Sequence, residues 1–328
     1  MPRLTLRDAL RQALREEMIR DPRIFLAGED IAQYQGAFKV TEGLLAEFGP
    51  QRVLDTPISE QVIVGLGVGA ALADLRPCVE LMTVNFALLA MDQIVNHASK
   101  WRYMSGGELA VPLVIRMPGG GGNQLAAQHS QSLEAWFVHT PGLLVLAPAT
   151  PHDAKGLLKA ALRTLDPVVF LEHESLYSLE GDVPEDDYVL PIGVGEVKRP
   201  GRDVTVVAYS RMVHLALEAA ERLAAEGVEC EVIDLRTLKP MDTELVLASV
   251  VKTGRLVCVE ECWRTCGVMA EVAAQIQEFG FDYLDAPIQR VSGADVPMPY
   301  SKPLEAAALP DTDRIIAAVR RSLGRSKE

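Results

Sequence analysis

DTPISEQVIVGLGVGAALADLRPCVELMTVNF, residues 55–86, places one carboxylate, Glu60, at the head of an apolar segment with helical character. Pro57 can open a helix there, because a proline at the first helical position gives up only a hydrogen bond that would be unmade anyway. Gly65 and Gly69 lie four residues apart, on one helix face, so we expect another helix to approach closely. The stretch predicts an acid beside a tight helix–helix contact, surrounded by apolar side chains.

Three interpretations of this stretch compete. Glu60 is an ordinary first-turn carboxylate stabilised by the helix dipole, or it is a catalytic acid. The third interpretation is a dinucleotide fingerprint, since Gly65, Gly67 and Ala70 satisfy G-x-G-x-x-G/A. That fingerprint needs a full strand before it, and only the apolar run 62–64 precedes it, so the rest of the chain must decide between the first two.

Length and composition narrow the class of protein. A chain of 328 residues, 48% of them apolar, predicts two domains with sizeable cores. A net charge of −13, without any basic block, argues against a nucleic-acid partner. No apolar stretch reaches 18 residues, so we expect no membrane span.

Cysteine usage and the N-terminus indicate the compartment. Five cysteines are an odd count in a long chain, which favours free thiols in a reducing cytosol over a disulfide framework. Three of them recur every four residues, but their segment looks like a buried strand, which argues against a metal cluster. Residues 1–18 predict an amphipathic helix capped by Thr5, with neither a signal nor a transit peptide. We expect a bacterial cytoplasmic protein; a plastid-encoded origin stays open, because it too would lack a transit peptide.

Apolar strands alternate with helices along the whole chain, which predicts an α/β fold with parallel sheets covered on both faces. One long helix is expected at 86–103. Composition shifts to proline, glycine and acids near residue 181, which indicates a linker. We therefore predict a parallel-sheet domain at 1–185, a linker at 186–203 and a smaller α/β domain at 204–328.

The best candidate among the six histidines is His129, which follows the glycine run 119–122 and lies among polar residues. A loop at the end of a strand favours function over packing, although a histidine that only ties loop carbonyls together is an equal alternative. The glycine run could cradle phosphate through its amides, but it lacks the Lys-Ser/Thr of a P-loop. No G-D-G followed by Asn, the metal–diphosphate pattern of thiamin enzymes, is present.

Eight ordered motifs covering nearly the whole chain resemble the β subunits of pyruvate dehydrogenase E1, thiamin-diphosphate enzymes of α2β2 architecture. Their two domains are similar to the pyrimidine-binding and C-terminal domains of transketolase. The motifs are DTPISEQ (55–61), ELMTVNF (80–86), YMSGG (103–107), QHSQ (128–131), DAKGL (153–157), VFLE (169–172), VIDLR (232–236) and DVPMPY (295–300).

The resemblance implies roles for five residues. Glu60 would hydrogen-bond N1′ of the aminopyrimidine and favour the 4′-imino tautomer, which removes the C2 proton. An apolar pocket strengthens such a hydrogen bond. Phe86 would stack on the pyrimidine, while Ile58 and Met82 line the same pocket. His129 would orient substrate and move protons near the reacting carbon.

The resemblance also implies partners and ions. The α subunit of an α2β2 heterotetramer would hold the diphosphate and its Mg²⁺, so this chain should be inactive alone. The acetyl group from pyruvate would pass to lipoyl-lysine of the dihydrolipoyl acetyltransferase (E2). Cys266 stands where this family usually has glycine. Some relatives bind potassium, and the matching positions here are Leu113, Ala161, Leu162, Thr164 and Asp166, with Thr164 replacing an aspartate.

Two alternatives to a pyruvate dehydrogenase subunit remain open. Within the same chemistry, the chain would be the β subunit of a branched-chain 2-oxoacid or acetoin dehydrogenase. In a different class, it would be a non-catalytic scaffold that only docks E2.

Overall fold

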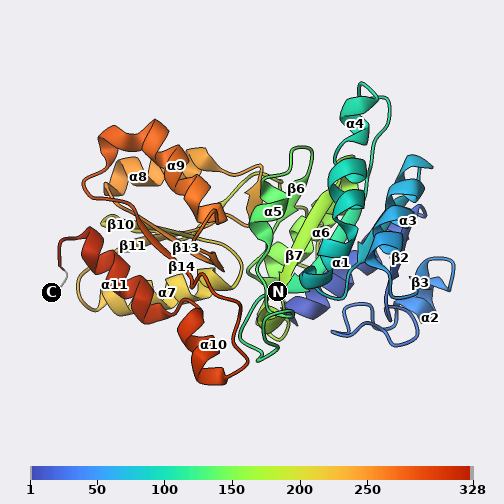
Figure 1. Ribbon diagram of the computed structural model, residues 1–328, viewed down its shortest axis with the longest axis horizontal. Helices are drawn as coiled ribbons and strands as arrows, with labels where there is room; N and C mark the ends of the chain where they lie inside the picture. Colours follow the sequence, from blue (N-terminus) through green and yellow to red (C-terminus); the bar gives the residue numbers. More distant parts are fainter. Residues whose placement is uncertain (1, 326–328) are drawn as a thin grey trace. The chain divides into compact units, whose positions relative to one another are not determined.

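The computed structural model describes residues 2–325, which form two compact units (Figure 1). The first unit comprises residues 1–119 and 136–192, and the second comprises 120–135 and 193–328. The segment 120–135, expected in the first domain, packs with the second unit. Residues 186–203, expected to be a linker, include a strand of the second unit's sheet, β9 (Glu196–Arg199).

The first unit is built on a parallel sheet, as the alternation of strands and helices predicts. Its strands run in the order β6-β7-β5-β4-β2-β3, and every neighbouring pair among them is parallel. Most strand residues are buried, which fits a sheet covered on both faces. The strands are β2 (Ile24–Gly28), β3 (Val53–Asp55), β4 (Arg76–Glu80), β5 (Val114–Gly119), β6 (Leu144–Leu146) and β7 (Val168–His173); β1 (Arg3–Thr5) pairs with β8 (Glu180–Asp182) in a separate ribbon.

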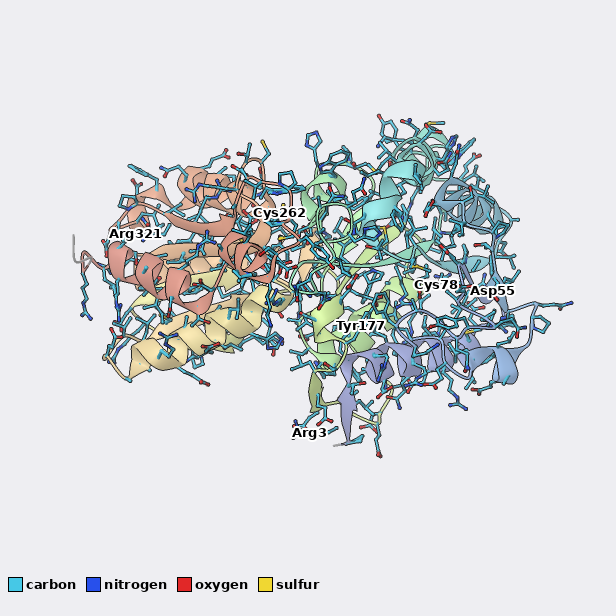
Figure 2. All side chains as sticks on the ribbon, turned by 60° about the horizontal axis from the view of Figure 1, so that its bottom comes forward. Arg3, Asp55, Cys78, Tyr177, Cys262 and Arg321 are labelled. Carbon is cyan, nitrogen blue, oxygen red and sulfur yellow. The ribbon has the colours of Figure 1, made fainter. Side chains whose placement is uncertain are left out.

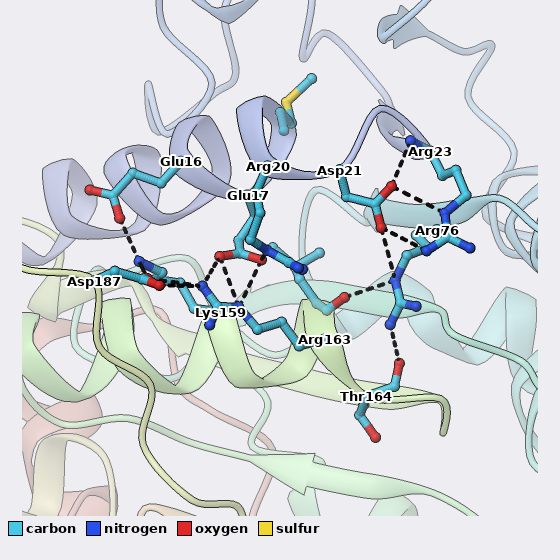
Figure 3. Close-up of polar contacts among 12 residues, drawn as sticks. Glu16, Glu17, Arg20, Asp21, Arg23, Arg76, Lys159, Arg163, Thr164 and Asp187 are labelled. Carbon is cyan, nitrogen blue, oxygen red and sulfur yellow. Dashed lines mark hydrogen bonds and ion pairs between the residues drawn. The ribbon is translucent and has the colours of Figure 1, made fainter.

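Helices α1 and α6 pack against each other along a seam of ion pairs (Figure 3). Glu17 of α1 is fully buried and accepts hydrogen bonds from Arg163 (2.6 Å) and Arg20 (2.7 Å). Both helices begin at a threonine that accepts a backbone N–H, which satisfies one of the free donors of a first turn. The helices of this unit are α1 (Leu6–Arg20), α2 (Leu44–Phe48), α3 (Glu60–Leu72), α4 (Trp101–Met104), α5 (Glu134–Val138), whose first two residues belong to the second unit, and α6 (Pro151–Arg163).

The close approach expected on α3 is made by a different glycine, and to the sheet. A Cβ on Gly67 would lie 2.7 Å from Leu113 and 3.1 Å from Val79, so only glycine lets α3 pack this tightly. Gly65 does face a helical segment, since a Cβ there would lie 3.7 Å from Gln93 of 93–98, whereas Gly69 has nothing within 4 Å in this chain. The glycines lie inside the helix and not at a strand–helix turn, which rules out the dinucleotide interpretation.

The single helix expected at 86–103 is broken into short segments. Ser99 donates to the backbone carbonyl of Val95 (2.7 Å) and so competes with the backbone ladder, and Asn85 donates to the Thr83 side chain (2.6 Å) at the start of the first segment. Hydrophobic periodicity alone does not reveal this competition. The segments are a 3₁₀-helix (Val84–Ala90), a π-helical turn (Gln93–Ala98) and α4.

A buried arginine joins three neighbouring strands of the first unit. Arg116 on β5 is 2% exposed and donates to both carboxylate oxygens of Glu172 on β7, at 2.7 and 2.8 Å. Its Nη1 donates to Glu80 on β4 at 2.5 Å. Burial opposes the charge of Arg116, but the two carboxylates outweigh burial and raise its pKa. The guanidinium therefore stays charged and holds β4, β5 and β7 together.

The second unit has a smaller mixed sheet in the order β14-β13-β10-β11-β9, parallel except for the antiparallel edge strand β9. The sheet's remaining strands are β10 (Val204–Ala208), β11 (Cys230–Asp234), β13 (Leu256–Trp263) and β14 (Gln289–Gly293); β12 (Thr237–Lys239) is not part of this sheet. Its helices are α7 (Arg211–Ala224), α8 (Thr243–Thr253), α9 (Val268–Gly280), α10 (Lys302–Ala308) and α11 (Thr312–Ser322).

The cysteines are free thiols, and among residues 2–325 no helix is long and apolar enough to cross a bilayer. Cys258 and Cys262 are buried on β13, whereas Cys266 is exposed in a turn. Cys266 has a φ of +56°, a backbone conformation that suits glycine. The glycine usual in the resembling family thus has a conformational reason.

The second unit buries a group of acids around Glu134. One oxygen of Glu134 has no hydrogen-bond partner among the described residues, and the Tyr209 hydroxyl also lacks one. Burial raises the pKa of Glu134 to about 8, and the charges of Glu261 and Glu260 add to the rise. Glu134 therefore holds a proton at neutral pH.

We predict that Arg116→Met lowers the free energy of unfolding by about 3–5 kcal/mol, because it strands two carboxylates in the core. Urea denaturation followed by fluorescence measures the change. The control is Arg102→Ala, whose ion pair with Asp166 is partly exposed, and should cost at most about 1 kcal/mol. A loss below about 1 kcal/mol for Arg116→Met would contradict the buried-bridge assignment.

A second prediction concerns pH. Between its unfolded pKa near 4.5 and its folded pKa of about 8, Glu134 is protonated only in the folded chain. This proton stabilises the fold fully below pH 4.5, and its contribution is lost as pH rises through 8. Relative to wild type, Glu134→Gln should therefore gain about 1.4 kcal/mol per pH unit between pH 5.5 and 7.5. Urea unfolding at several pH values tests this, with the exposed Glu278→Gln as control; parallel curves for Glu134→Gln and wild type would refute it.

Candidate functional site

The candidate site residues of the first unit follow three neighbouring strands and lie at one edge of the sheet. β4, β2 and β3 are adjacent and parallel, so their carboxyl ends meet, which is where ligands bind in such sheets. Ile58 and Glu60 follow β3, Glu29 follows β2, and Met82 and Phe86 follow β4. Helix α3, which begins at Glu60, packs against the helical segment that carries Phe86.

Glu60 is a buried carboxylate without a hydrogen-bond donor. It is the first residue of α3 and only 5% exposed. Among the described residues, none donates a hydrogen bond to its carboxylate. The helix N-terminus favours the negative charge there, but a buried carboxylate normally finds a donor. The position is therefore suited to a donor that comes from outside this chain.

A second acid lies beside Glu60. Burial raises the pKa of Glu29, and the neighbouring charges of Asp30 and Glu60 add to the rise. Two carboxyl groups therefore share the sheet edge. The sequence analysis did not single out Glu29.

The backbone around these acids is tightly fixed. Asp55, labelled in Figure 2, accepts hydrogen bonds from the backbone N–H groups of residues 32 and 33 at 2.6 and 3.0 Å. Thr56 donates its N–H to the carbonyl of Gly28 at 2.9 Å. A Cβ on Gly28 would lie 2.6 Å from the carbonyl oxygen of Glu80, so only glycine permits this approach of β2 to β4. The edge that carries Glu60 is therefore a rigid platform.

The apolar candidates differ in exposure. Met82 and Phe86 are half-buried, whereas Ile58 is 75% exposed. An isoleucine this exposed, next to a buried acid, fits a surface that another molecule covers.

His129 lies in the segment that belongs to the second unit. Its side chain is exposed in a turn, and its N–H donates to the carbonyl of Ala126 at 3.3 Å. His129 and Glu60 are thus carried by different units of the chain.

The glycine run before His129 binds carboxylates of its own chain. Gly121 donates its N–H to Glu261 at 2.6 Å, and Gly122 and Gln124 donate theirs to Glu305, both at 3.0 Å. Glu305 is 2% exposed. These amides are already occupied by negative groups, so the run does not fit a phosphate cradle. Glu261 and Glu305 instead hold the segment that carries His129.

Four of the five residues expected to bind potassium have oxygens that already accept hydrogen bonds or form an ion pair within the chain. Arg76 donates to the carbonyls of Leu162 (3.1 Å) and Thr164 (2.7 Å), and a guanidinium in that position competes with a cation (Figure 3). The remaining three are occupied or buried in other ways: Leu113 accepts the N–H of Val168 (2.8 Å), Asp166 pairs with Arg102, and Ala161 is buried in α6. Arg76 thus competes for two of the five positions, and the potassium site stays a prediction. Within residues 2–325, no group of three or more His, Cys, Asp or Glu side chains could hold a metal ion.

The sequence analysis did not predict that Glu261 and Glu305 bind the glycine run, and the reason is physical. They lie 140 and 183 residues from the glycines they bind. No local pattern connects such distant positions, whereas Glu29 could have been found from its place at a strand end.

Comparison with known proteins agrees with this geometry. The family profile of the transketolase pyrimidine-binding domain matches residues 3–180, and that of the transketolase C-terminal domain matches 193–315. The chain is 52% identical to the mitochondrial pyruvate dehydrogenase E1 component subunit beta-1 of Arabidopsis thaliana, covering 99% of this chain and 90% of the relative. Identity to the pyruvate dehydrogenase E1 component subunit beta of Rickettsia felis is also 52%, over 97% of this chain and 98% of the relative.

A solved structure shows the same fold. The inactive beta4 tetramer of a split-gene transketolase superposes with a TM-score of 0.81 at 26% identity, covering 99% of both chains. Sequence similarity over nearly the full length and fold similarity thus lead to one assignment. The chain belongs to the family of pyruvate dehydrogenase E1 component β subunits, with transketolase-like pyrimidine-binding and C-terminal domains.

Proposed function

We propose that this chain is the β half of an α2β2 enzyme that oxidatively decarboxylates pyruvate with thiamin diphosphate and transfers the acetyl group to lipoyl-lysine of E2. Its relatives are named as pyruvate dehydrogenase subunits, which supports this substrate over branched-chain 2-oxoacids or acetoin. The observation that carries the proposal is Glu60, a buried acid at a sheet edge whose carboxylate receives no hydrogen bond within the described chain. We place the protein in a bacterial cytoplasm.

Glu60 would receive its missing hydrogen bond from N1′ of the aminopyrimidine. When bound, thiamin diphosphate supplies the carbon nucleophile and electron sink for decarboxylation. Glu60 holds or shares a proton at N1′, in surroundings where few waters compete for it, so the hydrogen bond is strong. Met82 and Phe86 provide half-buried apolar surface for the ring, and Ile58 provides an exposed one.

His129 would act on the substrate. Its imidazole is exposed, so a substrate can reach it, as a general acid–base group requires. The glycine run that precedes it is held at Gly121, Gly122 and Gln124 by buried carboxylates. His129 is thereby presented from an anchored segment and not from a free loop.

An exposed apolar face supports a partner chain. On α3, Val62 is 56% exposed and Leu66 44% exposed, and Gly69 beside them has nothing within 4 Å. Leu89 is a further exposed apolar side chain, at 66%. Such a face, next to Glu60, suits the α subunit, which would also hold the diphosphate and its Mg²⁺.

The function is tested by assaying the chain, assembled with its α subunit, on pyruvate, 2-oxoisovalerate and acetoin. We expect pyruvate to have a kcat/KM at least about 10-fold above that of the branched acid, the discrimination that one or two methyl groups typically allow. A preference for 2-oxoisovalerate or acetoin would assign the chain to the corresponding sister enzyme.

The role of Glu60 is tested by Glu60→Gln, which keeps the shape of the side chain but does not take or give the proton. We expect pyruvate turnover to fall by about 10²–10⁴-fold, the range for loss of a proton-transfer group. Light scattering should show an unchanged α2β2 assembly, and the surface variant Glu47→Gln should retain full activity. Wild-type turnover by Glu60→Gln would remove Glu60 from its role and leave the E2-docking scaffold as the better interpretation.

A further inference from the structure

The second unit contains a cavity lined mainly by arginines. Its volume is about 300 Å³, at the lower end of the range for small-molecule sites, roughly 300–1,000 Å³. The cavity lies between the turn after β13, the strand β14 and the helix α11. The lining residues are Arg264, Arg290, Val291, Arg314, Ala317 and Arg321.

The guanidinium groups are oriented by uncharged oxygens. Arg264 donates to the carbonyl of Arg290 at 2.8 Å, and Arg314 donates to the carbonyls of Leu309 (3.0 Å) and Ser292 (2.6 Å). Arg321, labelled on α11 in Figure 2, donates through Nε to the side-chain amide of Gln289 at 3.2 Å. Since each guanidinium has five N–H donors, these contacts fix its position and leave further donors for a ligand.

Carboxylates do not balance this positive charge. Among residues 2–325, Arg264, Arg314 and Arg321 form no ion pair; Arg290 pairs with one carboxylate, Glu260, at 3.3 Å, and also donates to the carbonyl of Arg264. Glu260 is shared, because it also accepts hydrogen bonds from Ser292 Oγ (3.0 Å) and the N–H of Met269 (2.9 Å). The nearby Asp295 is held by Thr265. Four positive charges therefore meet one paired carboxylate, Glu260, and one nearby carboxylate, Asp295, whose pKa is lowered by its hydrogen bonds from Thr265 and by the charge of Arg264.

An unsatisfied donor gives independent support. Nε of Arg290 is buried and has no hydrogen-bond partner among the described residues. Buried donors without partners are rare in folded proteins, and a bound ion can supply the missing acceptor. Arg290 lines the cavity, so an anion seated there could satisfy this donor.

We propose that this cavity binds the phosphate group of a small molecule. Guanidinium groups match phosphate because their planar forks donate two parallel hydrogen bonds to its oxygens. Four guanidinium groups around a small cavity suit a multiply charged anion better than a ligand that carries a single carboxylate. The cavity uses neither Glu60 nor His129, so the site stands apart from the proposed catalytic function.

Isothermal titration calorimetry of the full chain tests this site, with inorganic phosphate, pyrophosphate, citrate and chloride at matched ionic strength. We expect saturable binding, tighter for pyrophosphate than for phosphate, and none for chloride. Arg321→Gln should weaken pyrophosphate binding at least about 10-fold, which corresponds to about 1.4 kcal/mol for a lost charge-assisted contact. Arg264→Gln provides a second variant with the same expectation.

Arg320→Gln is the matched control, because it changes the same helix by one residue. Arg320 pairs with Glu226 and does not line the cavity, so its variant should bind like wild type. Thermal unfolding in chloride checks that each variant is folded. The proposal is overturned if phosphate does not bind saturably or if the position-320 and position-321 variants lose equal affinity for pyrophosphate. Tighter binding of citrate than of pyrophosphate would also overturn it.

Discussion

The first unit depends on one buried guanidinium. Arg116 spans β4, β5 and β7 through its two carboxylate partners, and its backbone carbonyl accepts the N–H of Leu81 at 3.0 Å. One residue thus fixes both the spacing of the strands and the start of the segment that leads to Met82 and Phe86. A buried ion pair of this kind adds little to the free energy of unfolding. Removing one of its partners destabilises the fold strongly, because an unpaired charge then stays buried. The bridge therefore specifies geometry at the end of the sheet where the candidate site lies.

Buried carboxylates in this protein have four different environments, which separate structural from functional acids. Glu172 is paired with a guanidinium, Glu305 accepts backbone N–H groups, and Glu134 is protonated. Glu60 is buried, and its carboxylate forms no ion pair and receives no hydrogen bond within the described chain. This contrast supports our proposal that Glu60 is the functional acid and that its hydrogen bond comes from a bound group.

Much of the fold followed from local patterns, and the exceptions have physical causes. The parallel sheets and the threonine-capped helix starts were predictable, because alternation of strands and helices and N-cap chemistry are encoded within a few residues. The choice of Gly67 over Gly65 for close packing depends on Leu113, which is distant in sequence. The break in the helix at 84–104 depends on side-chain hydrogen bonds that periodicity does not register. The packing of segment 120–135 with the second unit depends on hydrogen bonds to Glu261 and Glu305. These residues are distant in the sequence, so no local pattern predicts the contact.

The carboxylate of Glu60 receives no hydrogen bond within the described chain, and we propose that a second subunit completes the active site. Isothermal titration calorimetry with thiamin diphosphate and Mg²⁺ measures this directly for the chain alone, the α subunit alone and their mixture. A shared site predicts binding only by the mixture, with one cofactor per αβ pair. Equally tight binding by the isolated chain would contradict it.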